Sequence, residues 1–284
     1  MPKILVTGKT GQLGSEIQRW TKEGNLLFPE SDFVFVGRED LSLSGPEMES
    51  WIEKNHITHI INAAAYTAVD KAESDSENAF LLNATIPGIL ARIAHQRKIR
   101  LVHISTDFVF DGLASSPYTE DHSKNPLCVY GASKSQGEDA VLTECPEATI
   151  LRTSWVYSKF GNNFVKTILR IAEQKEKLTV IYDQIGSPTW ARDLARVCLQ
   201  LLPMEAPGIF HYSNEGVASW YDFAKEIVEW SGSICEVLPI LATEYPLPAK
   251  RPGFSLLHKG KIKDSLSIRI PHWKESLQKM LTDL

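Results

Sequence analysis

Cysteines are few in this sequence, and their spacing argues against covalent or metal cross-links. The 284 residues include only 4 cysteines, with no Cys-x-x-Cys pair and no histidine-rich cluster beside them. Neither a disulfide framework nor a zinc site is indicated by such spacing, and no bound metal is expected. Reduced thiols are the simpler expectation.

Long hydrophobic runs are also missing. No apolar run approaches the roughly 20 residues that a transmembrane helix needs. Met1-Pro2-Lys3 leads at once into a strand-like segment, so no targeting segment is recognised. With reduced thiols, the sequence predicts a cytoplasmic protein with no membrane partner.

Positive charge is not in excess. The formal net charge of −5 at pH 7 gives no basic field for nucleic acid or for an anionic membrane surface. Any phosphate binding must therefore be local. A hydrophobic content of 43% lets the chain bury a sizeable core, as one large α/β domain with a smaller lobe.

Strand-like and helix-like segments alternate in the first half of the chain. This order predicts a Rossmann-like, doubly wound parallel sheet covered by helices on both faces. The expected strands are Ile4–Val6, Phe33–Val36, His59–Asn62, Leu101–Ile104 and Thr149–Leu151, and the expected helices are Gln12–Lys22, Pro46–Lys54, Glu77–Gln96 and Leu127–Leu142. Pro87 should kink or split the third helix, because proline removes an i−4 hydrogen bond.

The pattern changes after Leu151. Helical segments are now separated by loops rich in proline and glycine, which we expect to form a substrate lobe. The expected helices are Phe164–Gln174, Trp190–Leu202, Trp220–Trp230 and Pro271–Leu281. We therefore expect a cofactor domain of residues 1–151 with parts of 190–215, and a substrate lobe made mainly of 152–284.

Three glycines, Gly8, Gly11 and Gly14, lie between the first expected strand and helix. Glycine tolerates the positive φ that a tight turn needs, and its lack of a side chain lets a pyrophosphate approach the backbone at a helix N-terminus. The segment therefore predicts a dinucleotide site, which also includes Lys9, Gln12 and Leu13. Because the spacing is Gly-x-x-Gly-x-x-Gly, an ordinary glycine-rich turn stays open on this motif alone.

Tyr130 and Lys134 are four residues apart in an expected helix, which places them on one face. An ammonium beside a phenol should lower the phenol's pKa and make it a better proton donor. Thr106 lies at the expected carboxyl end of a strand, where its hydroxyl can bind a substrate carbonyl. Each feature alone also fits a structural role, as surface residues or as a turn cap.

Together these motifs resemble the extended short-chain dehydrogenase/reductase family, through Gly8/Gly11/Gly14, Asn62-Ala63-Ala64-Ala65, Ser105-Thr106-Asp107 and Tyr130/Lys134. Within it, more specific segments over nearly the whole chain resemble the dTDP-4-dehydrorhamnose reductases. These are Ala68-Val69-Asp70-Lys71-Ala72-Glu73, Asp107-Phe108-Val109-Phe110, Arg152-Thr153-Ser154-Trp155-Val156-Tyr157, Gly161-Asn162-Asn163-Phe164 and Asp183-Gln184-Ile185-Gly186-Ser187-Pro188-Thr189. The resemblance implies an NAD(P)H-dependent oxidoreductase that reduces dTDP-4-dehydro-β-L-rhamnose to dTDP-L-rhamnose, the last step of dTDP-rhamnose biosynthesis for polysaccharide.

The resemblance also implies roles for individual residues. Tyr130 is the group placed to protonate the carbonyl oxygen, and Thr106 would hold that oxygen. Lys134 would also bind the nicotinamide ribose. The other implied contacts are Asp40, Leu41, Ala63, Ala64 and Ala65 with the cofactor, and Asp107 and Trp155 with the sugar nucleotide.

Cofactor preference is suggested by the end of the second expected strand, which runs into Gly37-Arg38. A carboxylate that would bind the ribose 2′-hydroxyl of NADH is missing there. Arg38, helped by Lys9, could instead bind the 2′-phosphate of NADPH. Glu39 and Asp40 follow directly, so use of NADH stays open, and both cations also fit a solvated surface.

The sugar-nucleotide end of the site is expected at Asn162, Asn163 and Arg251. The segment from Tyr245 to Pro252 is rich in proline, and a guanidinium held there could pair with a diphosphate. A solvated arginine, and a turn with a helix cap at the two asparagines, are the alternatives.

The sequence also bears on three other functions and on one metal. A dehydratase of the superfamily would carry Glu where Phe108 stands, an epimerase would favour an acidic residue at Gly37-Arg38, and a regulatory subunit of methionine adenosyltransferase type would bind a partner protein without catalysis. Some relatives use magnesium through carboxylates that join two subunits. Here Glu16 and Asp283 could serve, but Arg192 stands where a third acid is expected. The sequence therefore argues against a metal-bridged dimer and leaves monomer and homodimer open.

Overall fold

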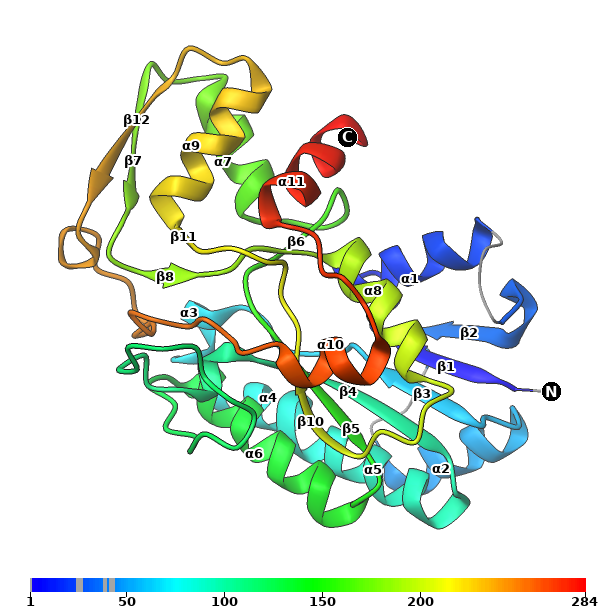
Figure 1. The fold of residues 1–284 in the computed structure, drawn as a ribbon. Coiled ribbons are helices and arrows are strands. Elements are labelled where there is room, and N and C mark those ends of the chain that lie inside the picture. The colour runs from blue at the N-terminus through cyan, green and yellow to red at the C-terminus, as the bar shows by residue number, and fades with distance from the viewer. Residues whose placement is uncertain (1, 24–27, 38–39, 41–43) are drawn as a thin grey trace.

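The computed structural model describes residues 2–23, 28–37, 40 and 44–284. Its centre is a 6-stranded parallel sheet in the order β10-β5-β4-β3-β1-β2 (Figure 1). The strands are β1 (Ile4–Thr7), β2 (Phe33–Val36), β3 (His59–Asn62), β4 (Arg100–Thr106), β5 (Thr149–Thr153) and β10 (Gly208–His211). The predicted Rossmann-like sheet is confirmed. A strand from the second half of the chain, β10, was not predicted and extends the sheet beyond β5.

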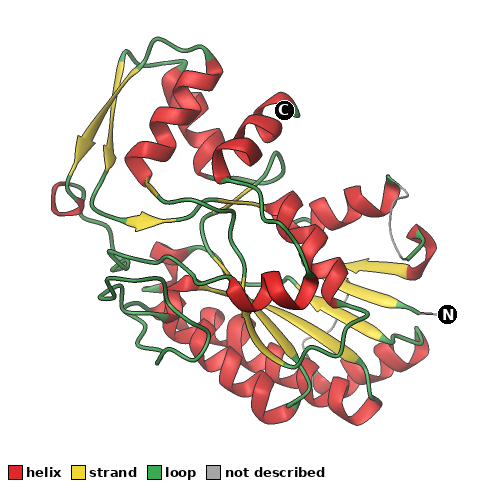
Figure 2. Ribbon diagram, viewed as in Figure 1, coloured by secondary structure: helices red, strands yellow, loops and turns green. Residues whose placement is uncertain are grey.

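Helices cover both faces of the sheet (Figure 2). On one face α1 (Gln12–Lys22) packs beside α8 (Ala191–Leu201), and the other carries α2 (Gly45–Lys54), α5 (Ile86–Arg97) and α6 (Val129–Glu144). Side chains alternate between the two faces of a strand. Ile4 and Val6 therefore join the core under α1 and α8, whereas Leu5 joins the core under α2 and α5. Burial on both faces explains why β1 is apolar throughout.

The helix expected over Glu77–Gln96 is divided. The chain forms α4 (Ser76–Phe80), a π-helical turn η2 (Leu81–Thr85), and then α5. Pro87 lies in the first turn of α5 and has no N–H for the Asn83 carbonyl, its i−4 partner. That carbonyl faces α6 so closely that a Cβ on Gly137 would lie 1.9 Å from its oxygen. The split therefore lets α6 approach the π turn.

Residues beyond β5 build a second lobe with its own core. An aromatic and aliphatic cluster lies between α7 (Phe164–Ala172), α9 (Trp220–Ser231) and α11 (Trp273–Thr282), and the parallel pair β7 (Lys177–Ile181) and β12 (Glu236–Ile240) packs on it. These helices lie where they were predicted, but the strands were not predicted. Shorter elements are α3 (Val69–Ala72), α10 (Gly260–Leu266), β6 (Val156–Tyr157), β8 (Ile185–Gly186), β9 (Thr189–Trp190), β11 (Ala218–Ser219) and the 3-10 turns η1 (Glu30–Asp32), η3 (Asp107–Val109) and η4 (Ala242–Glu244). Within the described ranges, no helix is long and apolar enough to cross a membrane.

Candidate active site

The glycine turn after β1 leaves the start of α1 open. Gly8 has a φ of +76°, and a Cβ on Gly14 would lie 2.2 Å from the Gly8 carbonyl oxygen, so both positions require glycine. The N-cap of α1 is Gly11, which has no side chain to bind the first N–H groups. The backbone of Ala63 and Ala64 packs against Gly8. Unpaired N–H groups at a helix start fit the pyrophosphate of a dinucleotide.

Asp40 lies beside this turn and neutralises Lys9. Its carboxylate is 2.5 Å from the Lys9 ammonium and accepts a hydrogen bond of 2.8 Å from the Gly37 N–H. The Gly37 N–H and the Lys9 ammonium lower the pKa of Asp40. Lys9 is therefore already paired with a carboxylate. The expected cofactor contacts Arg38 and Leu41 lie outside the described residues.

A row of polar side chains joins the carboxyl ends of β1 and β3 to the middle of β4. The Thr7 hydroxyl donates to Asn62 Oδ1 at 2.7 Å and accepts from the Ala64 N–H at 3.0 Å. Asn62 Nδ2 lies 3.0 Å from His103 Nδ1, and His103 Nε2 lies 3.5 Å from Lys134 Nζ. The row thus joins the sheet to the lysine predicted to be catalytic.

His103 lies between Asn62 and Lys134, with Nδ1 facing the Asn62 side-chain amide and Nε2 facing Lys134 Nζ. Burial, and secondarily the Lys134 charge, hold the pKa of His103 well below its usual value, so the ring is neutral.

Lys134 itself is buried, with 2% of its surface exposed. Its ammonium donates to the Ile104 carbonyl at 2.7 Å. Burial lowers its pKa to about 8, although Glu138 opposes the shift. The pKa of Lys134 is therefore closer to neutral pH than that of a surface lysine.

Tyr130 lies one turn before Lys134 on α6, with its ring edge-to-face on Phe108 at 5.4 Å. Burial raises the pKa of Tyr130 above its usual value, while the Thr106 side chain acts in the opposite direction. The expectation that Lys134 lowers the phenol pKa is therefore wrong for this structure, because the Lys134 amine is turned to Ile104 and His103. The phenol remains protonated at neutral pH, as a proton donor must be.

Thr106 and Asp107 follow one another where β4 ends. The Thr106 hydroxyl donates to Asp107 Oδ1 at 3.0 Å and also caps the 3-10 turn η3 by accepting from the Phe108 N–H. Thr106 therefore caps the turn, and its role as a site residue stays a prediction. Asp107 is 1% exposed, and its Oδ2 lacks a hydrogen bond of good geometry within the described structure, although the Ser255 side chain lies close to the carboxyl. Burial raises the pKa of Asp107 to about 6, while the Ser255 and Thr106 side chains oppose the shift.

Two residues missed at the sequence level support this centre. Asn83, in the π turn, accepts from the Tyr66 N–H and donates to Ser133 Oγ at 2.9 Å, and Ser133 donates to the Tyr130 carbonyl. His103 completes the polar row described above. The sequence did carry a signal for His103. It lies two residues before Ser105 on a strand that leads into Ser-Thr-Asp, and alternate residues of a strand share a face.

Trp155 adopts a φ of +48°, which is rare for a tryptophan. Its ring stacks on Trp220 at 3.6 Å with an interplanar angle of 6°. A Cβ on Gly186 would come 2.6 Å from this ring, so glycine is required there. Trp220 was not predicted as a site residue. The pair forms a rigid aromatic surface in the second lobe.

The other predicted substrate residues are placed as follows. Asn163 caps α7 through the Lys166 N–H and donates to Gln12 Oε1 at 3.0 Å, which links the second lobe to the glycine turn. Asn162 is exposed. Arg251 makes two hydrogen bonds to the Asp70 carboxylate, at 3.0 and 2.7 Å. Leu13 is buried in the core under α1, so only its backbone is available to a cofactor.

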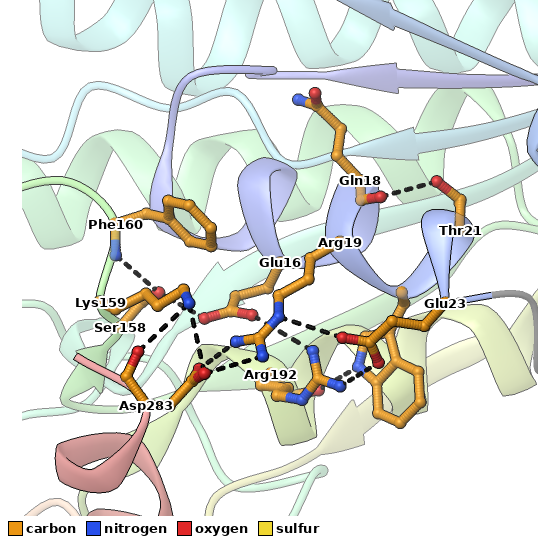
Figure 3. A network of polar contacts seen from close by, with 11 residues as sticks. Glu16, Gln18, Arg19, Thr21, Glu23, Ser158, Lys159, Phe160, Arg192 and Asp283 are labelled. Atoms are coloured by element: carbon orange, nitrogen blue, oxygen red, sulfur yellow. Dashed lines mark hydrogen bonds and ion pairs between the residues drawn. The ribbon is translucent and has the colours of Figure 1, made fainter.

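Glu16 and Asp283, the acidic residues considered as magnesium ligands, lie in a network of paired acidic and basic side chains (Figure 3). Asp283 is bound by Arg19 and by Lys159, and Arg192 pairs with Glu23. Glu16 is fully buried, accepts from Ser158 Oγ at 2.6 Å and faces Arg192 at 3.9 Å. Magnesium needs several free oxygen ligands. The residues here do not fit it, because three cationic side chains already bind the carboxylates.

Comparisons with known proteins cover the whole chain. The family model of the RmlD substrate binding domain matches residues 2–284. A dTDP-4-dehydrorhamnose reductase from Sinorhizobium fredii is 40% identical over 291 residues, which are 98% of this chain and 96% of that protein. The structure of a dTDP-4-dehydrorhamnose reductase from Clostridium acetobutylicum has a TM-score of 0.93 at 39% identity and covers 99% of this chain and 98% of its own. That of the enzyme from Bacillus anthracis, in complex with NADP, has a TM-score of 0.94 at 33% identity and covers 100% of both chains.

Proposed function

This chain belongs to the family of the RmlD substrate binding domain, and we infer that it is an NAD(P)H-dependent oxidoreductase of dTDP-rhamnose biosynthesis. Its reaction is the reduction of dTDP-4-dehydro-β-L-rhamnose at C4 to dTDP-L-rhamnose, with NADPH as the reductant. The observation that carries this function is the meeting of Thr106, Tyr130 and Lys134 at the carboxyl ends of the strands, beside the open start of α1.

When bound, the dihydronicotinamide supplies the hydride. We propose that Tyr130 gives its phenolic proton to the sugar oxygen as negative charge develops there. Burial keeps this proton on the phenol at neutral pH. Thr106 would donate a hydrogen bond to the same oxygen in exchange for its present bond to Asp107. Two donors would then face the oxygen in a site where burial strengthens both bonds.

We propose that Lys134 binds the nicotinamide ribose and that His103 orients it. The Lys134 ammonium donates to the Ile104 carbonyl and lies 3.5 Å from His103 Nε2, and with three N–H groups it can also donate to a ribose hydroxyl. The proposed cofactor contacts remain Gly8, Lys9, Gly11, Gln12, Leu13, Gly14, Arg38, Asp40, Leu41, Ala63, Ala64, Ala65, Tyr130 and Lys134. With Lys9 paired to Asp40, Arg38 is the cation we propose for the 2′-phosphate.

The sugar nucleotide would lie between the two lobes. The Oδ2 of Asp107, which lacks a hydrogen bond of good geometry, supports a contact with a sugar hydroxyl, because a poorly paired buried acceptor is costly unless a ligand supplies a donor. Trp155, stacked on Trp220, offers an apolar face. Asn162, Asn163 and Arg251 are proposed for the nucleotide diphosphate, with Arg251 exchanging Asp70 for phosphate oxygens.

We propose that residues 1–151, with parts of 190–215, hold the cofactor and that 152–284 mainly hold the sugar nucleotide. The addition of β10 to the main sheet and the packing of α8 on α1 support this division. A cytoplasmic location fits the four cysteines, none of which is in a disulfide within the described structure. No magnesium-bridged assembly is proposed, and the choice between monomer and homodimer is left to measurement.

The decisive experiment supplies the purified protein with NADPH and enzymatically prepared dTDP-4-dehydro-β-L-rhamnose. We expect NADPH oxidation, followed as loss of its absorbance, and dTDP-L-rhamnose as the product identified by NMR. The matched control is Y130F, which keeps the ring and removes the proton. Steady-state rates with NADH and with NADPH then measure the cofactor preference.

Other outcomes would identify the rival functions. An epimerase would change the sugar without net NADPH oxidation. A non-catalytic regulatory protein would oxidise NADPH no faster than Y130F and would bind a partner protein tightly. Either result would contradict the proposed reduction.

A further inference from the structure

Three potential metal ligands meet at the edge of the sheet opposite the active site. They are His95 in the last turn of α5, Cys145 at the end of α6, and Glu147 in the following turn. Their ligand atoms all lie within 4.8 Å of one another. His95 Nδ1 is 3.0 Å from Glu147 Oε2, and Cys145 Sγ is 3.8 Å from the same oxygen.

The backbone fixes two of these ligands relative to each other. The Ala148 N–H donates to the Cys145 carbonyl at 2.9 Å, which closes a tight turn around Pro146. Proline in this place restricts φ and stiffens the turn. The Cys145 N–H in turn donates to the Val141 carbonyl, so the turn is joined to the end of α6. His95 comes from the neighbouring helix and completes the group.

We propose that His95, Cys145 and Glu147 form a binding site for Zn²⁺, with a water molecule as the fourth ligand. Thiolate, imidazole and carboxylate are the three side-chain ligands that this ion prefers. In a tetrahedral zinc site, neighbouring ligand atoms are separated by roughly 3.3–3.7 Å, as follows from the usual bond lengths. The observed separations require only side-chain adjustments, and His95 and Glu147 are free to make them because they are 51% and 68% exposed.

Cys145 is almost fully buried, at 2% exposure, and its thiol faces the Glu147 carboxylate. Binding of Zn²⁺ forms the zinc–sulfur bond and releases the thiol proton to water. No oxidant or reductant takes part.

The position of the site defines its effect. Strands β4 and β5 begin beside it, at Arg100 and Thr149, whereas Thr106 and the catalytic centre lie at their other ends. A metal here would join the ends of α5 and α6 and would stabilise the cofactor domain. It would not contact the reacting groups, so the inference is independent of the proposed reduction.

The test is a titration of metal-free protein with Zn²⁺ in competition with a chromogenic chelator, repeated with Co²⁺. We expect one tight site, a thermal midpoint that rises with Zn²⁺, and a near-ultraviolet thiolate-to-cobalt charge-transfer band. H95Q and E147Q change exposed groups and should each weaken binding at least tenfold. C145S should abolish the charge-transfer band, whereas C235S, at a buried cysteine in the other lobe, should leave it intact.

The following results would contradict the proposed Zn²⁺ site. Equal Zn²⁺ affinity in the parent protein, H95Q and E147Q, or a cobalt band that survives C145S, would overturn the proposal. The proposal would also be overturned if the chelator competition detected no tight Zn²⁺ site. If C145S does not fold, the two exposed variants decide the matter alone, with circular dichroism to show that they are folded.

Discussion

The core of the sheet domain and the junction between the two lobes are held together in different ways. In the first, backbone approaches too close for any side chain fix the geometry, as where Gly14 meets Gly8 and Gly137 meets Asn83. In the second, hydrogen bonds and ion pairs between side chains attach the lobe, as in Gln12 with Asn163. Contacts that depend on glycine tolerate almost no change, whereas exposed ion pairs contribute little each.

This difference decides where a substitution is most damaging. A proton donor and a hydride donor must be held to within fractions of an ångström, which rigid backbone packing provides. The contacts between the lobes are mainly polar, and polar contacts at a junction can be exchanged for water at small cost. Substitutions should therefore be most damaging on α6 and least damaging in the contacts between the lobes.

The largest expected effect is that of Y130F in the rigid centre. Loss of the phenolic proton should lower kcat by about 100-fold or more, because general acid catalysis is removed while the ring and its packing on Phe108 remain. Fluorescence titration should show that NADPH affinity changes far less than kcat, because only one of many cofactor contacts is altered. Near-normal turnover by the folded variant would exclude Tyr130 as the proton donor.

A second prediction tests the close approach of α6 to the π turn. In G137A the new Cβ would lie 1.9 Å from the Asn83 oxygen, so α6 must shift. We expect a loss of about 1–3 kcal/mol in unfolding free energy, measured by urea denaturation, together with a fall in kcat. G45A is the matched control, since the nearest atom to its Cβ would be 3.5 Å away. Equal stability of the two variants would refute the packing argument.

The sequence anticipates this rigid half well. Glycine requirements, strand alternation and the Tyr-x-x-x-Lys spacing are local, and the main strands lie where the sequence predicts them. The features that sequence reasoning misses depend on contacts between residues that are far apart in the chain. The approach of His103 to Lys134 depends on how β4 packs against α6, and the stacking of Trp155 on Trp220 joins segments that no local pattern connects.

The second lobe shows the same limit more strongly. Its two-residue strands carry no periodic signal, and the expected free guanidinium of Arg251 is instead paired with Asp70, 181 residues away. The wrong expectation for the Tyr130 pKa has a similar cause. Spacing placed Lys134 one turn from Tyr130 on α6, but only the packed structure shows that its amine binds the Ile104 carbonyl.

A third prediction concerns the buried Asp107 at the rigid end of β4. Its carboxyl has a pKa of about 6 in the folded protein and 3.8 as its unperturbed value. Between these pH values the folded state binds more protons, so its stability falls as the pH rises from about 4 to 6 and stays lower above. D107N removes this penalty and should be more stable than the parent by roughly 1–3 kcal/mol at pH 7.

The measurement for Asp107 is urea denaturation at several pH values between 4 and 7. The advantage of D107N should shrink towards pH 4, and its activity should fall because a sugar contact is weakened. D264N, at an exposed position, is the control and should show no such pH trend. A D107N protein that is less stable than the parent at pH 7 would contradict the argument that burial of this charge is unfavourable.

The smallest effect is expected in the charge network between the lobes, where chelators should leave activity unchanged. Arg19, Lys159 and Arg192 already neutralise Asp283, Glu23 and Glu16, so Mg²⁺ finds no free carboxylates (Figure 3). R192E sharpens the test, since it removes one cation and adds a third acid beside Glu16. Its thermal midpoint should fall and then rise by a few degrees with Mg²⁺, while that of the parent stays constant. Activity of the parent that is lost with EDTA and restored by Mg²⁺ would show that the metal displaces these cations from the carboxylates.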